Sequence, residues 1–272
     1  MGKLKTQVRK ALLEMRYPFL QRRQWASLIG PDLAEKVDWP VVDEPLPDSD
    51  LADVFADAAH IQKWAHYLPI YESTLTTYRD RPIKMLEIGV CRGGSLAMWR
   101  RYLHPETVIV GIDIDPETKQ YDDPANQVHV RIGGQQDVDF LRDVAEEFGP
   151  FDVILDDGSH ISSHMIGTFQ YLFPNALADG GAYLVEDIHA NYWRQFRDTT
   201  ATFADFTKHL TDAMHAHYRL GKGEKFFHVG GWRRRRQFRV PLATTIVDRI
   251  EVHDSLTVVH RKSRTPPRSI FK

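Results

Sequence analysis

The sequence predicts a doubly wound α/β protein with a mostly parallel sheet, an antiparallel hairpin near the C-terminus and a helical extension at the N-terminus. Between residues 81 and 188, five short apolar runs alternate with helical segments of about a dozen residues. This alternation is typical of a parallel sheet that helices cover on both faces, in a Rossmann-like arrangement. Two more apolar runs lie close together within residues 245–262, as in a hairpin at a sheet edge. With 272 residues, of which 42% are hydrophobic, the chain suffices for one large α/β domain with an appendage, or for two small domains.

The N-terminal part precedes the predicted sheet. Residues 3–33 carry apolar side chains at roughly helical spacing, and the Pro- and Asp-rich stretch 38–50 reads as an extended linker or strap. Residues 51–80 are expected to be helical, with Pro69 opening or kinking the second part. We therefore expect a helical extension with a Pro-rich linker over residues 1–80 and the main domain over 81–272.

The main domain follows in order. The runs expected to form strands span residues 83–90, 107–115, 128–134, 151–159 and 181–188, and the intervening helices 95–103, 137–149 and 164–177. Residues 191–240 form a long connection that we expect to contain a helix and a functional loop, because plain coil of this length is uncommon inside a domain. Two strands around His253 and Ser255 complete the pattern as the terminal hairpin.

The composition and charge of the chain argue against several classes of function. The net charge of −2 lacks the basic footprint of a nucleic-acid-binding protein, and no apolar stretch approaches the length of a membrane span. The single cysteine, Cys91, rules out an intrachain disulfide and a cysteine-based zinc cluster. We expect a soluble protein of a reducing cytoplasm. The run Arg233–Arg236 suggests RNA or an anionic lipid as a partner. A solvated loop or a contact with an acidic acceptor explains four basic residues better.

A glycine-rich turn, "LEIGVCRGGSL", follows the first strand and opens a helix. Glu87, Gly89 and Gly93 give the spacing E-x-G-x-x-x-G, with Ser95 in the first helical turn. Cys91 occupies the second glycine position of G-x-G-x-x-G, which favours a ligand without a pyrophosphate. Together with Asp113 at the end of the second strand, or Asp115, which would accept ribose hydroxyls, this is the pattern of class I S-adenosylmethionine-dependent methyltransferases. The alternative is an ordinary turn whose glycines serve packing.

Three further residues are candidates for contacts to this cofactor. Gln136 and Asp137 begin the helix after the third strand, where class I methyltransferases often contact the adenine, but capping explains Asp137 equally well. Asp156 is the natural last residue of the fourth strand and is expected to face the cofactor.

Acidic residues follow the fourth and fifth strands, in "ILDDGSH" and "YLVEDIH". Because carboxylates that converge on a cleft repel one another, they need protons or a cation, and an all-oxygen set suits Mg²⁺. We predict Asp157, Glu186 and Asp187 as metal ligands and His160 as general base, since imidazole titrates near neutral pH. Turn formation, helix capping or exposure in a loop would explain any single one of these residues.

The motifs "LEIGVCRGGSL", "GIDID", "ILDDGSH" and "YLVEDIHANYW" together resemble the macrocin and mycinamicin sugar O-methyltransferases, a group that includes rhamnosyl O-methyltransferases. The resemblance covers roughly residues 61–193 and the C-terminal "RIEVHDSLTVVHRK". It implies S-adenosylmethionine as methyl donor and Mg²⁺ held by Asp157, Glu186 and Asp187, with His160 as base. It also implies a sugar hydroxyl of a natural product or glycolipid as acceptor, which the residues alone do not indicate.

Other functions stay open at this point. The same fold would serve a catechol-like acceptor or an RNA ribose, or act as a non-catalytic partner protein. His189, Tyr192 and Trp193 would line an acceptor pocket or serve packing, and Trp64 would fold over the cofactor or belong to the core. A homo-oligomer built through the N-terminal helix is a further expectation.

Overall fold

The computed structural model describes residues 28–218 and 239–267, and the chain divides into two compact units, residues 1–46 and 47–272. In the first unit, residues 28–29 are helical and 35–46 have no regular structure, as expected for the strap. The rest of the predicted N-terminal helix, residues 3–27, lies outside the described residues.

The second unit begins at Pro47, and not near residue 81 as we expected. Two helices account for the difference: α2 (Asp50–Ala56), which Ser49 caps, and α3 (Tyr67–Arg79), with Pro69 in its first turn. Leu51, Tyr67 and Tyr71 of these helices are fully buried in the core. The segment before the first strand is therefore part of the folded unit.

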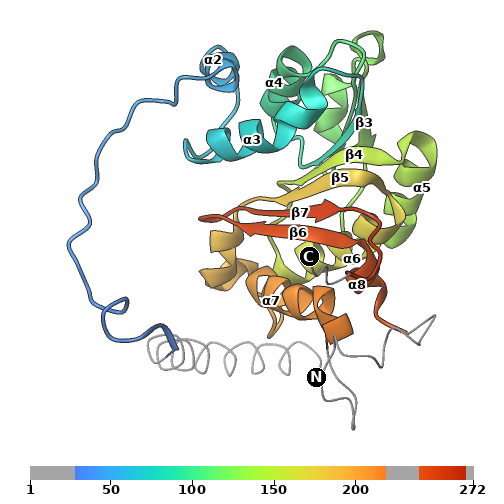
Figure 1. Cartoon of the computed structure of the whole chain (residues 1–272). Helices are drawn as coiled ribbons and strands as arrows, with labels where there is room; N and C mark the ends of the chain where they lie inside the picture. Colours follow the sequence, from blue (N-terminus) through green and yellow to red (C-terminus); the bar gives the residue numbers. More distant parts are fainter. Residues whose placement is uncertain (1–27, 219–238, 268–272) are drawn as a thin grey trace, which may run out of the picture. The chain divides into compact units, whose positions relative to one another are not determined.

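Seven strands form one sheet in the order β3-β2-β1-β4-β5-β7-β6 (Figure 1). The parallel strands are β1 (Lys84–Ile88), β2 (Val108–Asp113), β3 (Val128–Ile132), β4 (Phe151–Asp156) and β5 (Leu177–Val185). Strand β7 (Thr257–Arg261) pairs antiparallel with β5, and β6 (Val247–Val252) pairs antiparallel with β7 at the edge. The predicted doubly wound fold with a C-terminal antiparallel hairpin is confirmed.

Helices cover both faces of the sheet, as Figure 1 shows for α3 and α4 (Gly94–Tyr102) on one side and α6 (Ser162–Asn175) and α7 (Phe203–Met214) on the other. The remaining regular elements are α5 (Val138–Phe148), α8 (Leu242–Ile246) and the 3-10 helices η1 (Pro116–Tyr121), η2 (Pro124–Asn126), η3 (Ile188–Tyr192), η4 (Arg194–Phe196) and η5 (Ala216–Tyr218).

Each central strand contributes to two hydrophobic cores because its side chains alternate between the faces. Met85 of β1 belongs to the core under α2, α3 and α4, which contains Trp99, whereas its neighbour Leu86 belongs to the core under α5 to α8, which contains Phe169. This double burial explains why the strands read as continuous apolar runs.

Strand β5 begins at Leu177, earlier than the predicted residue 181, and its register against β4 is irregular between Phe151 and Val153. The Gly180–Gly181 pair therefore lies inside the strand. The helix expected within residues 191–240 is α7, whereas residues 219–238 of that connection lie outside the described part. Among the described helices, none is both long enough and apolar enough to cross a membrane.

Candidate active site

The glycine-rich turn connects β1 to α4 at the carboxyl edge of the sheet, where a ligand of a doubly wound fold binds. Gly89 has φ +97°, and a Cβ at this position would lie 2.2 Å from the backbone oxygen of Asp157. Gly93 has φ +72°, and its Cβ would lie 2.5 Å from the ring of Tyr121. Glycine is needed at both positions because a side chain would clash there and strain the backbone.

Asp113, at the end of β2, stabilises this turn. Its Oδ2 accepts hydrogen bonds from the backbone N–H groups of Val90 at 2.8 Å and Cys91 at 2.9 Å. Its Oδ1 accepts from the N–H of Asp115 at 2.9 Å. The carboxylate thus fixes the backbone that would approach a cofactor, and its predicted contact with a ribose stays a prediction. Asp115 itself caps η1.

Glu87 and Ser95 bind one another inside the protein. Glu87 is fully buried and accepts hydrogen bonds from Ser95 Oγ at 3.0 Å and from Trp99 Nε1 at 3.2 Å. Burial raises the pKa of Glu87 to about 7. The pair joins β1 to α4 under the turn, which is a structural role that our prediction of cofactor contacts did not include.

A pocket of about 440 Å³ lies beside the turn. The turn contributes Gly89, Cys91 and Ser95 to its wall, and the end of β4 contributes Asp157. The lining also includes His60–Lys63, in the loop between α2 and α3. Of the eight cofactor contacts predicted above, Gly89 and Ser95 line this pocket. The other six are not among its lining residues: Glu87, Gly93, Asp113, Gln136, Asp137 and Asp156.

Asp137, a candidate for contact with the adenine, caps a helix in the structure. Its Oδ1 accepts from the N–H groups of Asp139 at 3.0 Å and Phe140 at 3.2 Å, at the start of α5. The Gln136 side chain packs against Gly134, where an added Cβ would lie 2.5 Å from its amide nitrogen. Its contact with the adenine stays a prediction.

Asp156 is buried at the end of β4, where Gln135, a residue that the sequence analysis missed, binds it. The Gln135 amide nitrogen donates to Asp156 Oδ1 at 3.1 Å, and its oxygen accepts from the Ser159 N–H at 2.6 Å. Burial raises the pKa of Asp156 to about 7. Asp156 therefore supports the loop that carries His160, and its predicted role in cofactor binding is not visible in these contacts.

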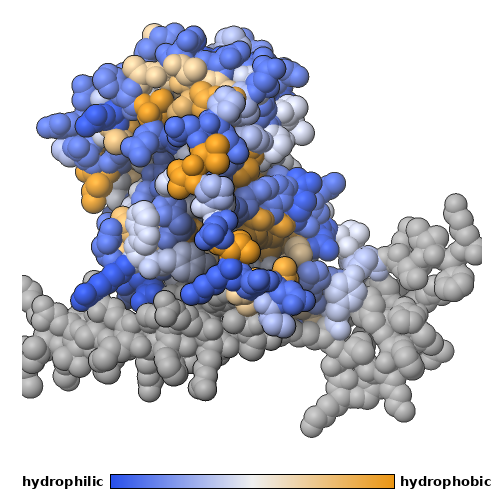
Figure 2. Space-filling model, turned by 90° about the vertical axis from the view of Figure 1, so that its left-hand side faces the viewer, coloured by the Kyte–Doolittle hydropathy of each residue, from blue (hydrophilic) through white to orange (hydrophobic). Residues whose placement is uncertain are grey.

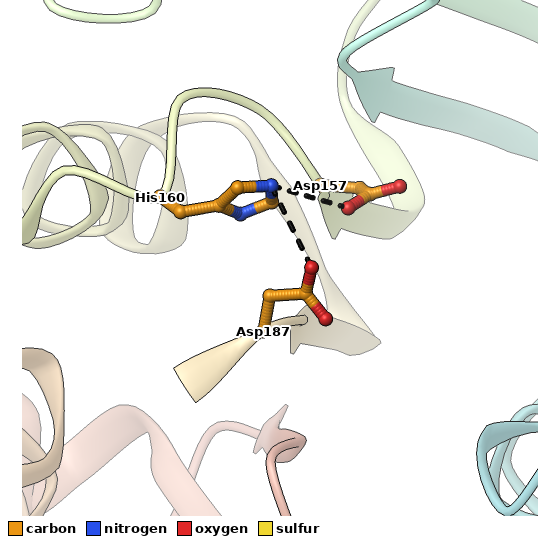
Figure 3. A group of neighbouring side chains, drawn as sticks. All are labelled: Asp157, His160 and Asp187. Carbon is orange, nitrogen blue, oxygen red and sulfur yellow. Dashed lines mark ion pairs between the residues drawn. The ribbon is translucent and has the colours of Figure 1, made fainter. Parts of the chain in front are cut away.

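Asp157, His160 and Asp187 converge at the carboxyl ends of β4 and β5 (Figure 3). His160 Nε2 lies 3.9 Å from Asp157 Oδ1 and 3.7 Å from Asp187 Oδ2. One ligand atom from each residue lies within 4.8 Å of the other two, which is an arrangement that could hold a metal ion. His160 and two of the three predicted metal ligands, Asp157 and Asp187, thus lie together, while their roles stay predictions.

Backbone strain accompanies this convergence. His160 has φ +55° and Asp187 has φ +52°. This left-handed conformation is unfavourable in free energy for any residue that carries a Cβ. The Tyr67 hydroxyl donates to Asp187 Oδ1 at 2.9 Å and so helps to hold that carboxylate. Strained residues of this kind cluster at functional sites, because surrounding contacts must maintain them.

Glu186 takes a different place from the one we predicted. Its side chain is 1% exposed and binds Lys63, whose Nζ lies 2.9 Å from both Glu186 oxygens and 2.5 Å from Asp157 Oδ2. Burial raises the pKa of Glu186 to about 8, and the negative charge of Asp157 adds to this effect. The structure thus gathers two of the three predicted metal ligands around His160, and the third around a lysine.

Lys63 is a second residue of this site that the sequence analysis missed. Burial by itself lowers its pKa, but Asp157 and Glu186 raise it above the ordinary value, so the ammonium stays charged. One feature of the sequence could have identified it: Lys63 is the only Lys or Arg between Leu51 and Tyr78.

Aromatic side chains surround His189 next to the carboxylates. The His189 ring lies 4.6 Å from Trp193 and 5.7 Å from Trp64 by ring centroids, and its Nδ1 lies 3.8 Å from Asp187 Oδ1. Trp64 and Trp193 are about half exposed.

The face seen in Figure 2 is mostly hydrophilic, with separate hydrophobic patches. The run Arg233–Arg236 lies outside the described residues.

Comparisons with known proteins agree with this geometry. Residues 86–188 match the family model of a methyltransferase domain. The chain is 39% identical over 166 residues to 8-demethyl-8-alpha-L-rhamnosyl tetracenomycin-C 2'-O-methyltransferase of Streptomyces olivaceus, covering 56% of this chain and 43% of that protein. It is 34% identical over 163 residues to mycinamicin VI 2''-O-methyltransferase of Micromonospora griseorubida, covering 54% of this chain and 39% of that protein.

Among solved structures, the chain is similar to MycE methyltransferase from the mycinamycin biosynthetic pathway in complex with Mg, SAH and mycinamycin VI. The TM-score is 0.65 at 26% identity, over 80% of this chain and 54% of the other. These matches confirm the resemblance drawn from the motifs. The chain spans less than half the length of the curated relatives that it matches.

Proposed function

We propose that this protein, a relative of the sugar O-methyltransferases with a methyltransferase domain over residues 86–188, methylates a sugar hydroxyl of a glycosylated natural product or glycolipid. S-adenosylmethionine would be the donor, the reaction would depend on Mg²⁺, and His160 would be the general base. The observation that carries the proposal is the convergence of Asp157, His160 and Asp187 beside the pocket of the glycine-rich turn.

The donor is assigned to the pocket because the glycine-rich turn lines it at the carboxyl edge of the sheet, where doubly wound folds bind their ligands. The acidic residues fit a hard divalent cation, since Asp157 and Asp187 supply carboxylate oxygens close together and remain partly exposed. Asp157 and Asp187 would hold the ion. Glu186 could join them only if it left Lys63.

The donor would supply a methyl group on a sulfonium, and the ion would lower the pKa of the acceptor hydroxyl. His160 would take the hydroxyl proton on Nε2, the nitrogen that faces the two carboxylates in Figure 3. Tyr67 and Gln135 would keep Asp187 and the loop of His160 in place. Trp64 and Trp193, both half exposed beside His189, would contact the acceptor.

The names of the relatives support the choice of acceptor, because they specify positions on sugars of tetracenomycin and mycinamicin. The similar MycE methyltransferase is in complex with Mg and with SAH, the demethylated form of the donor, which supports the choice of donor and ion. An antibiotic biosynthetic role is part of the proposal. Location in the cytoplasm and a homo-oligomer stay predictions.

The test is an incubation with S-adenosylmethionine and a panel of rhamnosylated polyketides, their aglycones, a catechol and an RNA oligonucleotide, with Mg²⁺ or with EDTA. Mass spectrometry should detect one added methyl group on the glycosides alone, and only with Mg²⁺. Methylation of the aglycones, catechol or RNA would refute the acceptor class. Methylation at full rate in EDTA would refute the metal requirement.

A further inference from the structure

A buried lysine, Lys63, forms ion pairs with two acids of the candidate active site. Lys63 lies in the loop between α2 and α3, and its side chain is 3% exposed. Its Nζ makes three hydrogen bonds, to Asp157 Oδ2 at 2.5 Å and to the two Glu186 oxygens at 2.9 Å each. Since an ammonium has three N–H donors, these acids satisfy it completely.

The acids that bind Lys63 come from the ends of neighbouring strands, the place where the proposed function puts a divalent cation. Asp157 takes part in both arrangements: its Oδ2 binds Lys63, while its Oδ1 lies 3.9 Å from His160. An ion held by Asp157 and an ammonium on the other oxygen of the same carboxylate would repel each other. Two cations at such a separation interact strongly where water is largely excluded.

The surroundings of Lys63 leave a route for the side chain to move. Residues 61–64 have no regular secondary structure, and Lys63 is one of the residues that line the pocket beside the glycine-rich turn. A lysine has a flexible four-carbon side chain and can adopt other rotamers without a change of the fold.

We propose that Lys63 is an internal counter-cation that competes with the divalent ion for Asp157 and Glu186. This inference rests on the metal requirement in the proposed function. Without the ion, Lys63 neutralises the acids and preserves the site. The ion binds at the cost of these contacts, so Lys63 lowers its affinity and keeps it exchangeable.

The test measures Mn²⁺ binding, by isothermal titration calorimetry and by the loss of the free-ion electron paramagnetic resonance signal. Lys63→Met removes the charge but keeps much of the side-chain volume, and Lys63→Arg keeps the charge. Lys208→Met is the matched control, because it removes an exposed lysine on α7 that pairs with Asp205. We expect Lys63→Met to bind Mn²⁺ at least about fivefold more tightly than wild type. Lys208→Met and Lys63→Arg should stay within about twofold.

An unchanged or weaker affinity in Lys63→Met would overturn the proposal, because a lysine that only supports the structure would disorder the ligands when removed. If that variant does not fold, NMR of the lysine ammonium groups in the wild type gives the answer, with Lys63→Arg for assignment. The Lys63 signal should shift or broaden on saturation with Mg²⁺, and a signal that stays unchanged would refute competition. Methyl transfer is assayed separately, so its absence would refute the proposed function without altering the result on metal binding.

Discussion

Replacing Gly89 by alanine tests whether the first turn and the end of β4 depend on each other. The new Cβ would lie 2.2 Å from the Asp157 backbone oxygen, where real Cβ contacts are not found below 3.0 Å. Asp157 would have to retreat by about 0.8 Å, the difference between those two distances. It cannot do so freely, because its N–H donates to the carbonyl of Ile88 in β1 at 2.9 Å.

The structure allows the two costs to be separated. The positive φ of Gly89 costs an alanine about 1–2 kcal/mol, and forcing a packed backbone apart costs about 1–3 kcal/mol more. Gly180 has a similar φ of +87° but nothing within 4 Å of an added Cβ, so Gly180→Ala should show the first cost alone. Gly167, inside α6, has neither problem, and Gly167→Ala should stabilise the protein by about 0.5–1 kcal/mol.

Urea unfolding followed by tryptophan fluorescence gives the free energy of unfolding of all three variants. Calorimetry with SAH shows whether the donor pocket survives. We expect Gly89→Ala to lose about 2–5 kcal/mol and to bind SAH weakly. A loss no larger than that of Gly180→Ala would refute the argument from the close approach of Asp157.

Three other predictions concern the site. His160→Ala should lower kcat by about 10²- to 10⁴-fold with unchanged SAH affinity, as stopped assays and calorimetry would show; a kcat near wild type would exclude His160 as base. Asp113→Asn should destabilise the protein by about 1–3 kcal/mol and weaken SAH binding, because an amide group would face the N–H donors of the turn; equal urea midpoints would contradict this. Burial raises the pKa values of Glu87 and Asp156 to about 7, above those of the unfolded chain, so their protons stabilise the fold at low pH and this stability is lost as pH rises through 7. Urea midpoints from pH 5 to 8 should show the loss, and Glu87→Gln should make it smaller, because only the contribution of Asp156 remains; an unchanged slope in that variant would contradict the assignment.

The sequence by itself predicted the fold and much of the site because both depend on local patterns. Apolar runs separated by helical segments indicate parallel strands, and parallel strands in a doubly wound sheet end at one edge. Asp157, His160 and Asp187 follow the ends of two such strands, so their convergence could be expected from their positions alone. The same reasoning placed the glycine-rich turn beside them.

Capping and packing roles were harder to separate from ligand contacts. Asp137 was expected either to cap a helix or to contact the adenine, and only the positions of the N–H groups at the start of α5 show that it caps. Glu87 was assigned to the cofactor because it belongs to the E-x-G-x-x-x-G motif, and Asp156 because it ends the fourth strand, but each is buried and hydrogen-bonded inside the protein.

Only the tertiary structure shows which acids of the site pair with a positive charge. Glu186 and Asp187 are adjacent in sequence and both follow the end of β5, yet Glu186 binds Lys63 whereas Asp187, which adopts a positive φ, faces His160. The lysine that binds Glu186 lies 123 residues away in the chain, in a loop without periodicity. Sequence patterns report the conformation of neighbouring residues, whereas the pairing of distant charges depends on how whole elements pack.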